Sequence, residues 1–196
     1  HPDQGIKTVQ DLDGRRFAVV PGITYWKWIK KEYGISAEEF PLKGDLALFG
    51  RSPEMFQQGY SIFLPARLED KGIANEQIKV SDLGYKPYST LFTTQKMIDE
   101  NPELVQEVVD RLRALNDPKP TMDLILGKSK KVTPAIHMNA IGLMKDEFLP
   151  KDYSKLGCMK TARWEELAGQ LKEVDVVPSD FDPSTSFNLS FMGNCE

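Results

Sequence analysis

Apolar and polar residues alternate in short blocks through the first half of the chain, a pattern typical of strands and helices that follow one another. Residues 15–20 form a largely apolar run that ends at a Pro-Gly pair, so we predict a short buried strand. Residues 25–33 carry apolar side chains at helical spacing. Thr24 is the predicted N-cap of this helix, and Gly34 lies where a C-terminal glycine belongs.

The next blocks predict two more strands with a short helix between them. We expect a strand at residues 40–42, a helix over residues 52–59 that begins at a Ser-Pro pair, and a strand at residues 60–64. Residues 78–83 and 89–93 are predicted to be extended and joined by a loop. Alternation of strand and helix favours an α/β fold with a partly parallel sheet.

Helical periodicity dominates the second half. Helices are predicted to begin at Asn101, Thr133 and Thr161, where a capping residue precedes an apolar stripe. Residues 178–196 are rich in Ser, Asp, Asn and Pro but contain spaced aromatic residues, so we expect a tail that wraps on the surface. The change in pattern places a domain break near residues 84–89.

The composition is that of a globular protein and narrows the function classes. Of 196 residues, 40% are hydrophobic and 28% charged, and 25 basic against 29 acidic residues give a formal net charge of −4. This acidic balance argues against a nucleic-acid-binding surface. No apolar run approaches the roughly 20 residues of a membrane-spanning helix. The N-terminus lacks the apolar core of a signal peptide, so we interpret the chain as processed or as a fragment.

Cysteine and histidine are too sparse for metal chemistry. Cys158 and Cys195 fit no zinc motif, and with only His1 and His137 available we expect no metal site and no cofactor. The two cysteines either pair in an oxidising compartment or remain thiols, and the residue pattern leaves both open. His137 is interpreted as a core or surface residue of a helix rather than as part of a catalytic triad.

The turn between the first strand and the first helix is the strongest candidate for a binding site. Backbone N–H groups at a helix N-terminus, together with the helix dipole, favour an anionic group. The predicted ligand contacts are Pro21, Gly22, Thr24, Tyr25 and Trp26. An ordinary capped helix with aromatic core residues is the alternative interpretation. Motifs of the Gly-x-Ser-x-Gly, Gly-x-Gly-x-x-Gly and Walker A types are absent from the sequence.

A second candidate site lies at the end of the strand predicted over residues 60–64. Leu64 and Pro65 would sit there at the edge of a cleft. A plain helix–strand connection is the alternative, and the residues alone favour it.

Several runs along the chain match a known pattern in the same order. The longest extends from Gly5 to Val19 and reads GIKTVQDLDGRRFAV. Shorter runs lie at residues 56–60, 64–65, 82–88, 101–105, 117–118 and 159–164. Together these runs resemble the motifs of periplasmic solute-binding proteins of ABC importers, in the group of thiamine-pyrimidine, alkanesulfonate and nitrate binders.

The resemblance implies a type 2 periplasmic-binding-protein fold, in which two α/β lobes close on a solute about a hinge. Residues 1–86 would form the second lobe, and residues 87–196 would form the C-terminal part of the first lobe with its wrapping tail. The first lobe would be incomplete, since the part that normally precedes the Gly5 run is absent. Tyr88 at the hinge becomes a further ligand-binding candidate. Leu64 replaces the family's usual glutamate, so no carboxylate is expected there to pair with a ligand amine.

The resemblance also implies a function without catalysis: capture of a small polar, aromatic or anionic solute for delivery to an ABC permease. The protein would be periplasmic or otherwise extracytoplasmic, would bind no nucleic acid, and would be a monomer, or a swapped dimer if half of the first lobe is missing. In an exported protein, Cys158 would pair with Cys195. The alternatives are a thiamine-pyrimidine-precursor synthase on the same scaffold, whose cysteine-rich iron motif this chain lacks, and the ligand-sensing domain of a regulator.

Overall fold

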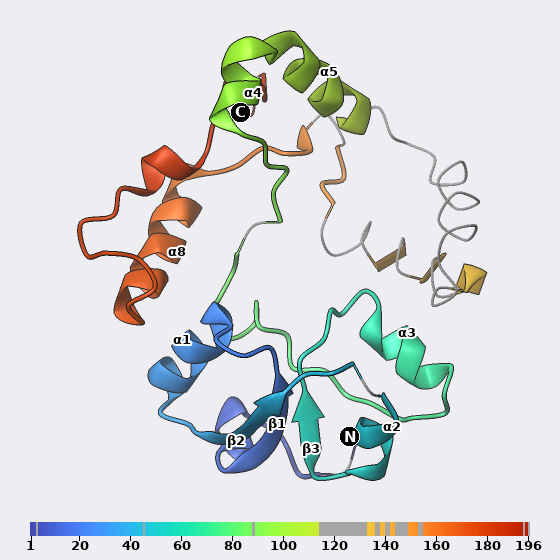
Figure 1. Ribbon diagram of the computed structural model, residues 1–196. Coiled ribbons are helices and arrows are strands. Elements are labelled where there is room, and N and C mark those ends of the chain that lie inside the picture. Colours follow the sequence, from blue (N-terminus) through green and yellow to red (C-terminus); the bar gives the residue numbers. More distant parts are fainter. Residues whose placement is uncertain are drawn as a thin grey trace. The chain divides into compact units, whose positions relative to one another are not determined.

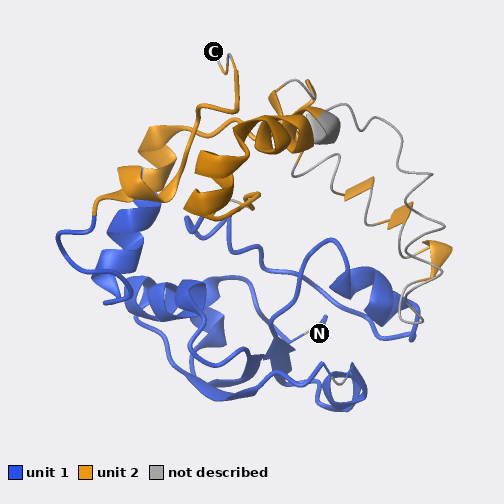
Figure 2. Cartoon of the chain, turned by 45° about the horizontal axis from the view of Figure 1, so that its top comes forward, with its two compact units in different colours: residues 1–86, 165–181 blue, residues 87–164, 182–196 orange. Residues whose placement is uncertain are grey.

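The structure is a computed structural model that describes residues 1–2, 4–44, 46–87, 89–113, 133–135, 138–139, 142–143, 149–152, 155–193 and 195. These residues belong to two compact units (Figure 2). Unit 1 contains residues 1–86 and 165–181, and unit 2 contains residues 87–164 and 182–196. The identification of these units with two lobes stays a prediction.

Unit 1 is built around a parallel sheet of three strands in the order β2-β1-β3 (Figure 1). The strands are β1 (Arg15–Val19), β2 (Ala37–Pro41) and β3 (Met55–Gln57), and a 3-10 turn, η1 (Val9–Leu12), precedes them. Phe17 of β1 pairs with Glu39 of β2 and Phe56 of β3. Helix α1 (Thr24–Tyr33) connects β1 to β2, and helix α2 (Leu46–Arg51) connects β2 to β3. This parallel arrangement confirms the predicted α/β class with a partly parallel sheet, whereas the two-lobed type 2 arrangement stays a prediction.

Alternation along the strands sends side chains into two separate cores. Phe17 and Val19 of β1 pack with α1, and the Phe56 ring stacks on Phe17 with 4.4 Å between centroids. The neighbouring positions face the other way, where Met55 joins a second core. The second core contains Leu46, Phe49, Met55 and Leu68, with Phe40, Leu64 and Ile73 packed against them.

Helix α1 forms as predicted, but its start differs. Ile23 is the N-cap and Thr24 is the first helical residue, so the hydroxyl of Thr24 does not cap the helix. Trp26 and Ile29, three residues apart, are buried against the sheet. Gly34 ends the helix in the left-handed conformation, with φ 63°, and its N–H donates to the carbonyl of Lys30.

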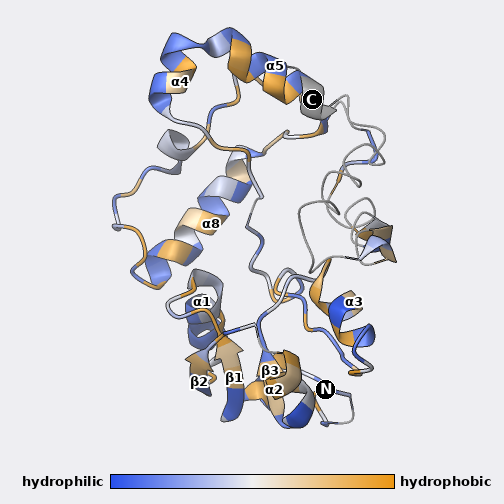
Figure 3. Cartoon of the chain, turned by 45° about the vertical axis from the view of Figure 1, so that its right-hand side comes forward, coloured by the Kyte–Doolittle hydropathy of each residue, from blue (hydrophilic) through white to orange (hydrophobic). Residues whose placement is uncertain are grey.

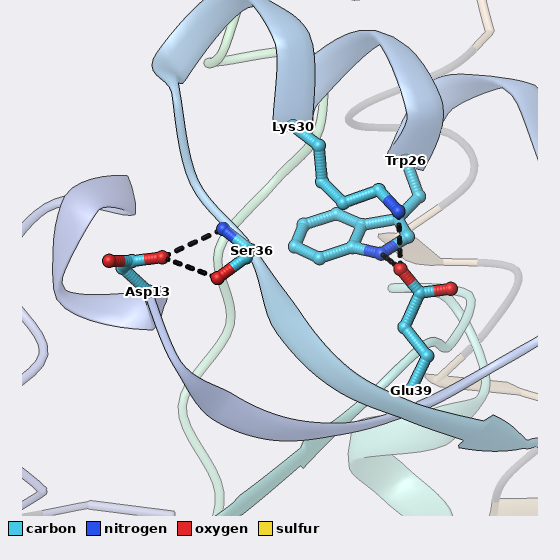
Figure 4. Close-up of polar contacts among 5 residues, drawn as sticks. All are labelled: Asp13, Trp26, Lys30, Ser36 and Glu39. Carbon is cyan, nitrogen blue, oxygen red and sulfur yellow. Dashed lines mark hydrogen bonds and ion pairs between the residues drawn. The ribbon is translucent and has the colours of Figure 1, made fainter.

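An aspartate joins the starts of the first two strands. The Asp13 carboxylate accepts hydrogen bonds from the backbone N–H of Ser36 at 2.7 Å and from its hydroxyl at 2.9 Å (Figure 4). These bonds lower the pKa of Asp13 from its ordinary value. The contact fixes the loop after η1 against the residue that leads into β2.

The predicted helix over residues 52–59 and strand over residues 60–64 are wrong. The carbonyl of Phe49 accepts from Ser52 N–H, and the carbonyl of Ser52 accepts from Met55 N–H, so the Ser-Pro pair forms a turn between α2 and β3. The helix in this part of the chain is α2, which ends at Arg51, before the Ser-Pro pair, and buries Leu46 and Phe49. Helix α3 (Leu64–Glu69) replaces the predicted strand, with Pro65 in its first turn and Leu68 buried.

Residues 78–83 do not form a strand either. Consecutive turns close residues 79–84 through backbone hydrogen bonds to the carbonyls of Lys79, Val80 and Ser81. Gly84 then adopts a φ of 89°, which an L side chain rarely tolerates, and the chain passes from unit 1 to unit 2 after Lys86. Residues 89–93 belong to no described sheet.

Helices α5 (Pro102–Arg113) and α8 (Thr161–Glu173) begin where the sequence predicts. Helix α4 (Gln95–Glu100) was not predicted; the Thr94 hydroxyl caps it by accepting from Met97 N–H at 3.1 Å. Figure 3 shows hydrophobic and hydrophilic residues interleaved along α5, consistent with its amphipathic pattern. The helix predicted from Thr133 lies largely outside the described residues. No helix in the described ranges is long and apolar enough to cross a membrane.

Helix α8 starts in unit 2 and ends in unit 1. Its last turn is tied to α1, because the Trp28 indole N–H donates to Glu173 at 2.9 Å and Lys31 donates to the Glu173 carbonyl. Gln170 is buried and its amide donates to the carbonyl of Gly84 at 3.0 Å. The end of α8, far from α1 in the sequence, therefore packs beside α1 in unit 1.

From Asp182 onward the C-terminal tail belongs to unit 2 and contacts other parts of that unit. Cys158 and Cys195 form a disulfide whose Cα atoms are 5.6 Å apart. The Phe187 ring stacks on Trp164 with 5.1 Å between centroids, and the carbonyl of Phe191 accepts from Gln106 at 3.1 Å. The tail includes a short 3-10 turn, η3 (Pro183–Ser186), capped by Asp182.

Candidate functional site

The strand order places a candidate site at the carboxyl ends of β1 and β3. The connection from β1 leads to β2 on one side, whereas β3 lies on the other side of β1. In open α/β sheets, ligands bind outside the carboxyl ends of strands, where the strand order reverses in this way. The loops concerned are residues 20–23 after β1 and residues 58–63 after β3, both in unit 1.

The loop after β1 is exposed and open. Pro21 and Gly22 are exposed, and Gly22 has a φ of 76°. A Cβ at this glycine would meet no atom within 4 Å, so free space surrounds it. The loop closes as a turn, since the N–H of Ile23 donates to the carbonyl of Val20 at 3.2 Å. The backbone here is accessible to a ligand.

Gln58 fastens the loop after β3 to the loop after β1. Its backbone N–H donates to the carbonyl of Ala18 at 2.9 Å, and its side-chain Oε1 accepts the N–H of Val20 at 2.9 Å. Sequence reasoning assigned Gln58 no role, because it placed the residue inside a helix. The signal that indicates it is the pair of glutamines at the end of a short strand, Gln57 within β3 and Gln58 directly after it.

Thr24 and Tyr25 start α1 at this edge. The hydroxyl of Thr24 lies 3.1 Å from the phenol oxygen of Tyr85, a buried residue that the sequence analysis did not select. Tyr25 is half-buried, and burial raises its pKa, with a smaller contribution from Tyr60. Its hydroxyl is protonated at neutral pH, as in any tyrosine, and can donate a hydrogen bond. The Tyr60 side chain, 76% exposed on the loop after β3, adds an aromatic surface.

Trp26 requires a correction, because it lies in the core and not at the predicted ligand surface. Only 4% of it is exposed, and its ring packs edge-on against Phe17 with centroids 4.6 Å apart. Its indole N–H donates to Glu39 at 2.9 Å, and Lys30 bonds the same carboxylate oxygen (Figure 4). Burial raises the pKa of Glu39, but the bonds from Lys30 and Trp26 outweigh this and leave the pKa lowered.

Leu64 and Pro65 begin α3 instead of ending a strand, which also corrects their predicted placement. Both are half-buried, and the Leu64 side chain packs on the second core. It also fills the space beside Gly59, where a Cβ would lie 2.9 Å from the Leu64 Cβ. The two residues therefore form the end of the loop after β3, and the Leu64 side chain supports this loop at Gly59. Tyr88 lies outside the described residues.

The groups gathered at this edge are hydrogen-bond donors and an aromatic ring. They comprise backbone N–H groups, a glutamine amide, tyrosine hydroxyls and an exposed aromatic ring. Within the described part of the chain, no group of three or more His, Cys, Asp or Glu residues is arranged to hold a metal ion. The donors suit a small solute that carries hydrogen-bond acceptors.

Comparison with known proteins places this chain in a family. No curated protein matches it. The family model described as NMT1/THI5 like matches residues 1–115 of the 196, which is more than half of the chain and includes the whole sheet with the candidate site. The parallel α/β fold is compatible with this match, and the chain belongs to the NMT1/THI5-like family.

Proposed function

We propose that this protein is the solute-binding component of an ABC importer and that it binds its solute without converting it. The NMT1/THI5-like family includes solute-binding proteins of this kind. The observation that carries the proposal is the pair of loops at the carboxyl edge of β1 and β3, joined by the bond between Gln58 and Val20. The edge offers a small solute both hydrogen-bond donors and an aromatic surface.

Binding would combine two kinds of contact. The N–H groups at the start of α1 lack partners within the helix and favour an acidic or amide group of the solute. The hydroxyl of Tyr25 would donate a further hydrogen bond, because a tyrosine hydroxyl is protonated at neutral pH. The ring of Tyr60 would pack on an apolar or aromatic portion of the solute.

Transport would depend on a shift in the populations of an open and a closed form of the protein. A solute that binds a closed form more tightly than an open form shifts the equilibrium toward the closed form. In the proposed mechanism the closed form then docks on the membrane permease, and the protein acts in the periplasm or another extracytoplasmic space. A disulfide such as the one between Cys158 and Cys195 persists in an oxidising compartment, which supports that location.

A thermal melt against a panel of solutes tests the proposal. The panel contains pyrimidine, benzenesulfonate, nitrate, benzoate and the polyamine spermidine. A solute present at 100 times its dissociation constant stabilises the folded state by about 2.7 kcal/mol, which raises Tm by about 5–11 °C. We expect one chemical class to shift Tm, and chromatography of the incubated solute to show it unchanged.

Two variants locate the site on the protein. Tyr25→Phe removes a hydroxyl at the candidate edge and should weaken binding of the active solute several-fold. Tyr33→Phe is the matched control, because Tyr33 lies at the other end of α1 and its hydroxyl donates to the carbonyl of Leu83 at 2.9 Å. Equal affinity of the two variants for the solute contradicts the site. A Tm that no solute changes contradicts the binding function. Chemical conversion of the solute contradicts the absence of catalysis.

A further inference from the structure

The side chain of Gln58 is held in one orientation. Val20 contributes a backbone N–H, which can only donate, so the atom that meets it at 2.9 Å is the amide oxygen. The backbone N–H of Gln58 is used by the carbonyl of Ala18. The planar amide therefore cannot turn over without breaking the bond that joins the two loops.

This orientation leaves only donors facing away from Val20. Oxygen and nitrogen lie on opposite sides of the planar amide group, so the Nε2 group points away from the Val20 N–H. Among the residues that the structure describes, no partner accepts a hydrogen bond from Nε2, and the side chain is half-buried, not enclosed. Two amide hydrogens are thus presented at the carboxyl edge of β1 and β3.

We propose that Gln58 is a specificity-determining residue that selects solutes with a hydrogen-bond acceptor, such as a carboxylate, sulfonate or ring nitrogen, and rejects protonated amines. This inference rests on the proposed function. Nε2 would donate to the acceptor atom of the solute, while Oε1 stays bound to Val20. An ammonium group at the same place would meet N–H donors and leave them without a partner, which is unfavourable.

The variant Gln58→Glu separates this role from a structural one. A carboxylate has the shape of the amide, and one of its oxygens can still accept the Val20 N–H. The other oxygen now replaces Nε2, so the outward atom changes from donor to acceptor while the loop contact is kept. Gln57→Glu is the matched control: it adds the same charge one position earlier, at the strand position paired with Ala18, which faces away from Phe56.

The solute panel then gives distinct outcomes. The wild-type protein should bind an acceptor solute (pyrimidine, benzenesulfonate, nitrate or benzoate) and not spermidine. Gln58→Glu should bind that solute at least roughly tenfold more weakly, the effect of losing a hydrogen bond to a charged or strongly polar group, and should gain affinity for spermidine. Gln57→Glu should keep the wild-type order of affinities.

Failure of this inference differs from failure of the proposed function. Binding of spermidine by the wild type, or unchanged selectivity in Gln58→Glu, overturns the role of Gln58 and leaves solute binding intact. A wild type that binds nothing in the panel overturns both.

Hydrogen exchange of the Val20 amide tests the anchor without any ligand. Exchange should be slow in the wild type and in Gln58→Glu, and at least roughly tenfold faster in Gln58→Leu, since the bond that protects the amide is lost. Equal exchange rates in all three proteins overturn the fixed orientation on which the selectivity depends.

Discussion

Opening the disulfide between Cys158 and Cys195 should destabilise the protein by an amount set by the loop that it closes. The two cysteines are separated by 37 positions in the sequence. In the chain-entropy model, ΔS is −2.1 − 1.5R ln n, which for n = 37 is about −13 cal/mol/K, or about 4 kcal/mol at 25 °C. The closed loop contains α8 and the tail aromatic residues, so the crosslink restrains a long and otherwise free part of the unfolded chain.

Urea unfolding of the wild type and of the double variant Cys158→Ser/Cys195→Ser measures this difference. Fluorescence of Trp164 reports on unit 2, where its ring stacks on Phe187. Trp26 and Trp28 are buried in unit 1, so the same measurement in Trp164→Phe follows that unit alone. Wild-type protein treated with dithiothreitol is the control and should unfold like the double variant.

The free energy of unfolding should fall by about 3–4 kcal/mol in the double variant, with the largest change in the signal of Trp164. A loss below about 1 kcal/mol would show that the crosslink closes a loop that is already restrained in the unfolded state, and the entropic account would be refuted.

Two further predictions concern the sheet and its loops. Gly59→Ala should lower the free energy of unfolding by about 1–3 kcal/mol in a urea titration, because the new methyl group would overlap the Leu64 side chain. The added change Leu64→Ala should then cost less than it does in the wild-type background; additive effects contradict the overlap. Asp13 has a pKa below its ordinary value of 3.8, so its contribution to stability is present above that pH and is lost as the pH falls through the lowered pKa. Asp13→Asn should flatten the stability profile in that acidic range, and an NMR titration that finds the pKa of Asp13 at or above 3.8 would exclude the bonds from Ser36.

The sequence predicts a helix correctly where the segment contains recognisable terminal residues of its own. Helix α1 ends at Gly34, and α8 begins at Thr161, as their terminal residues and apolar spacing predict. The error over residues 52–64 arose because a Ser-Pro pair is compatible both with a helix start and with a tight turn. The tight turn is favoured here because Met55, the first residue of β3, is buried in the second core directly after it.

The candidate site was predicted in part. The turn at Pro21 and Gly22 follows a recognisable strand, so its position at the sheet edge could be inferred from local pattern. Gln58 acts through a partner 38 positions away, and only the register between β1 and β3 brings the two loops together. Trp26 was misplaced because helical spacing shows which residues share a face, but not which face the sheet covers.

The discontinuity of unit 1 has a consequence for synthesis of the protein. Trp28 and Gly84 bond to Glu173 and Gln170, which the ribosome adds long after the sheet is complete. From Lys86 to Glu173 is 173 − 86 = 87 residues, which takes about 4–17 s at about 5–20 residues per second. During that interval the nascent sheet and α1 are present without the helix that finishes their outer side. The fold of unit 1 is therefore completed only after α8 has been translated.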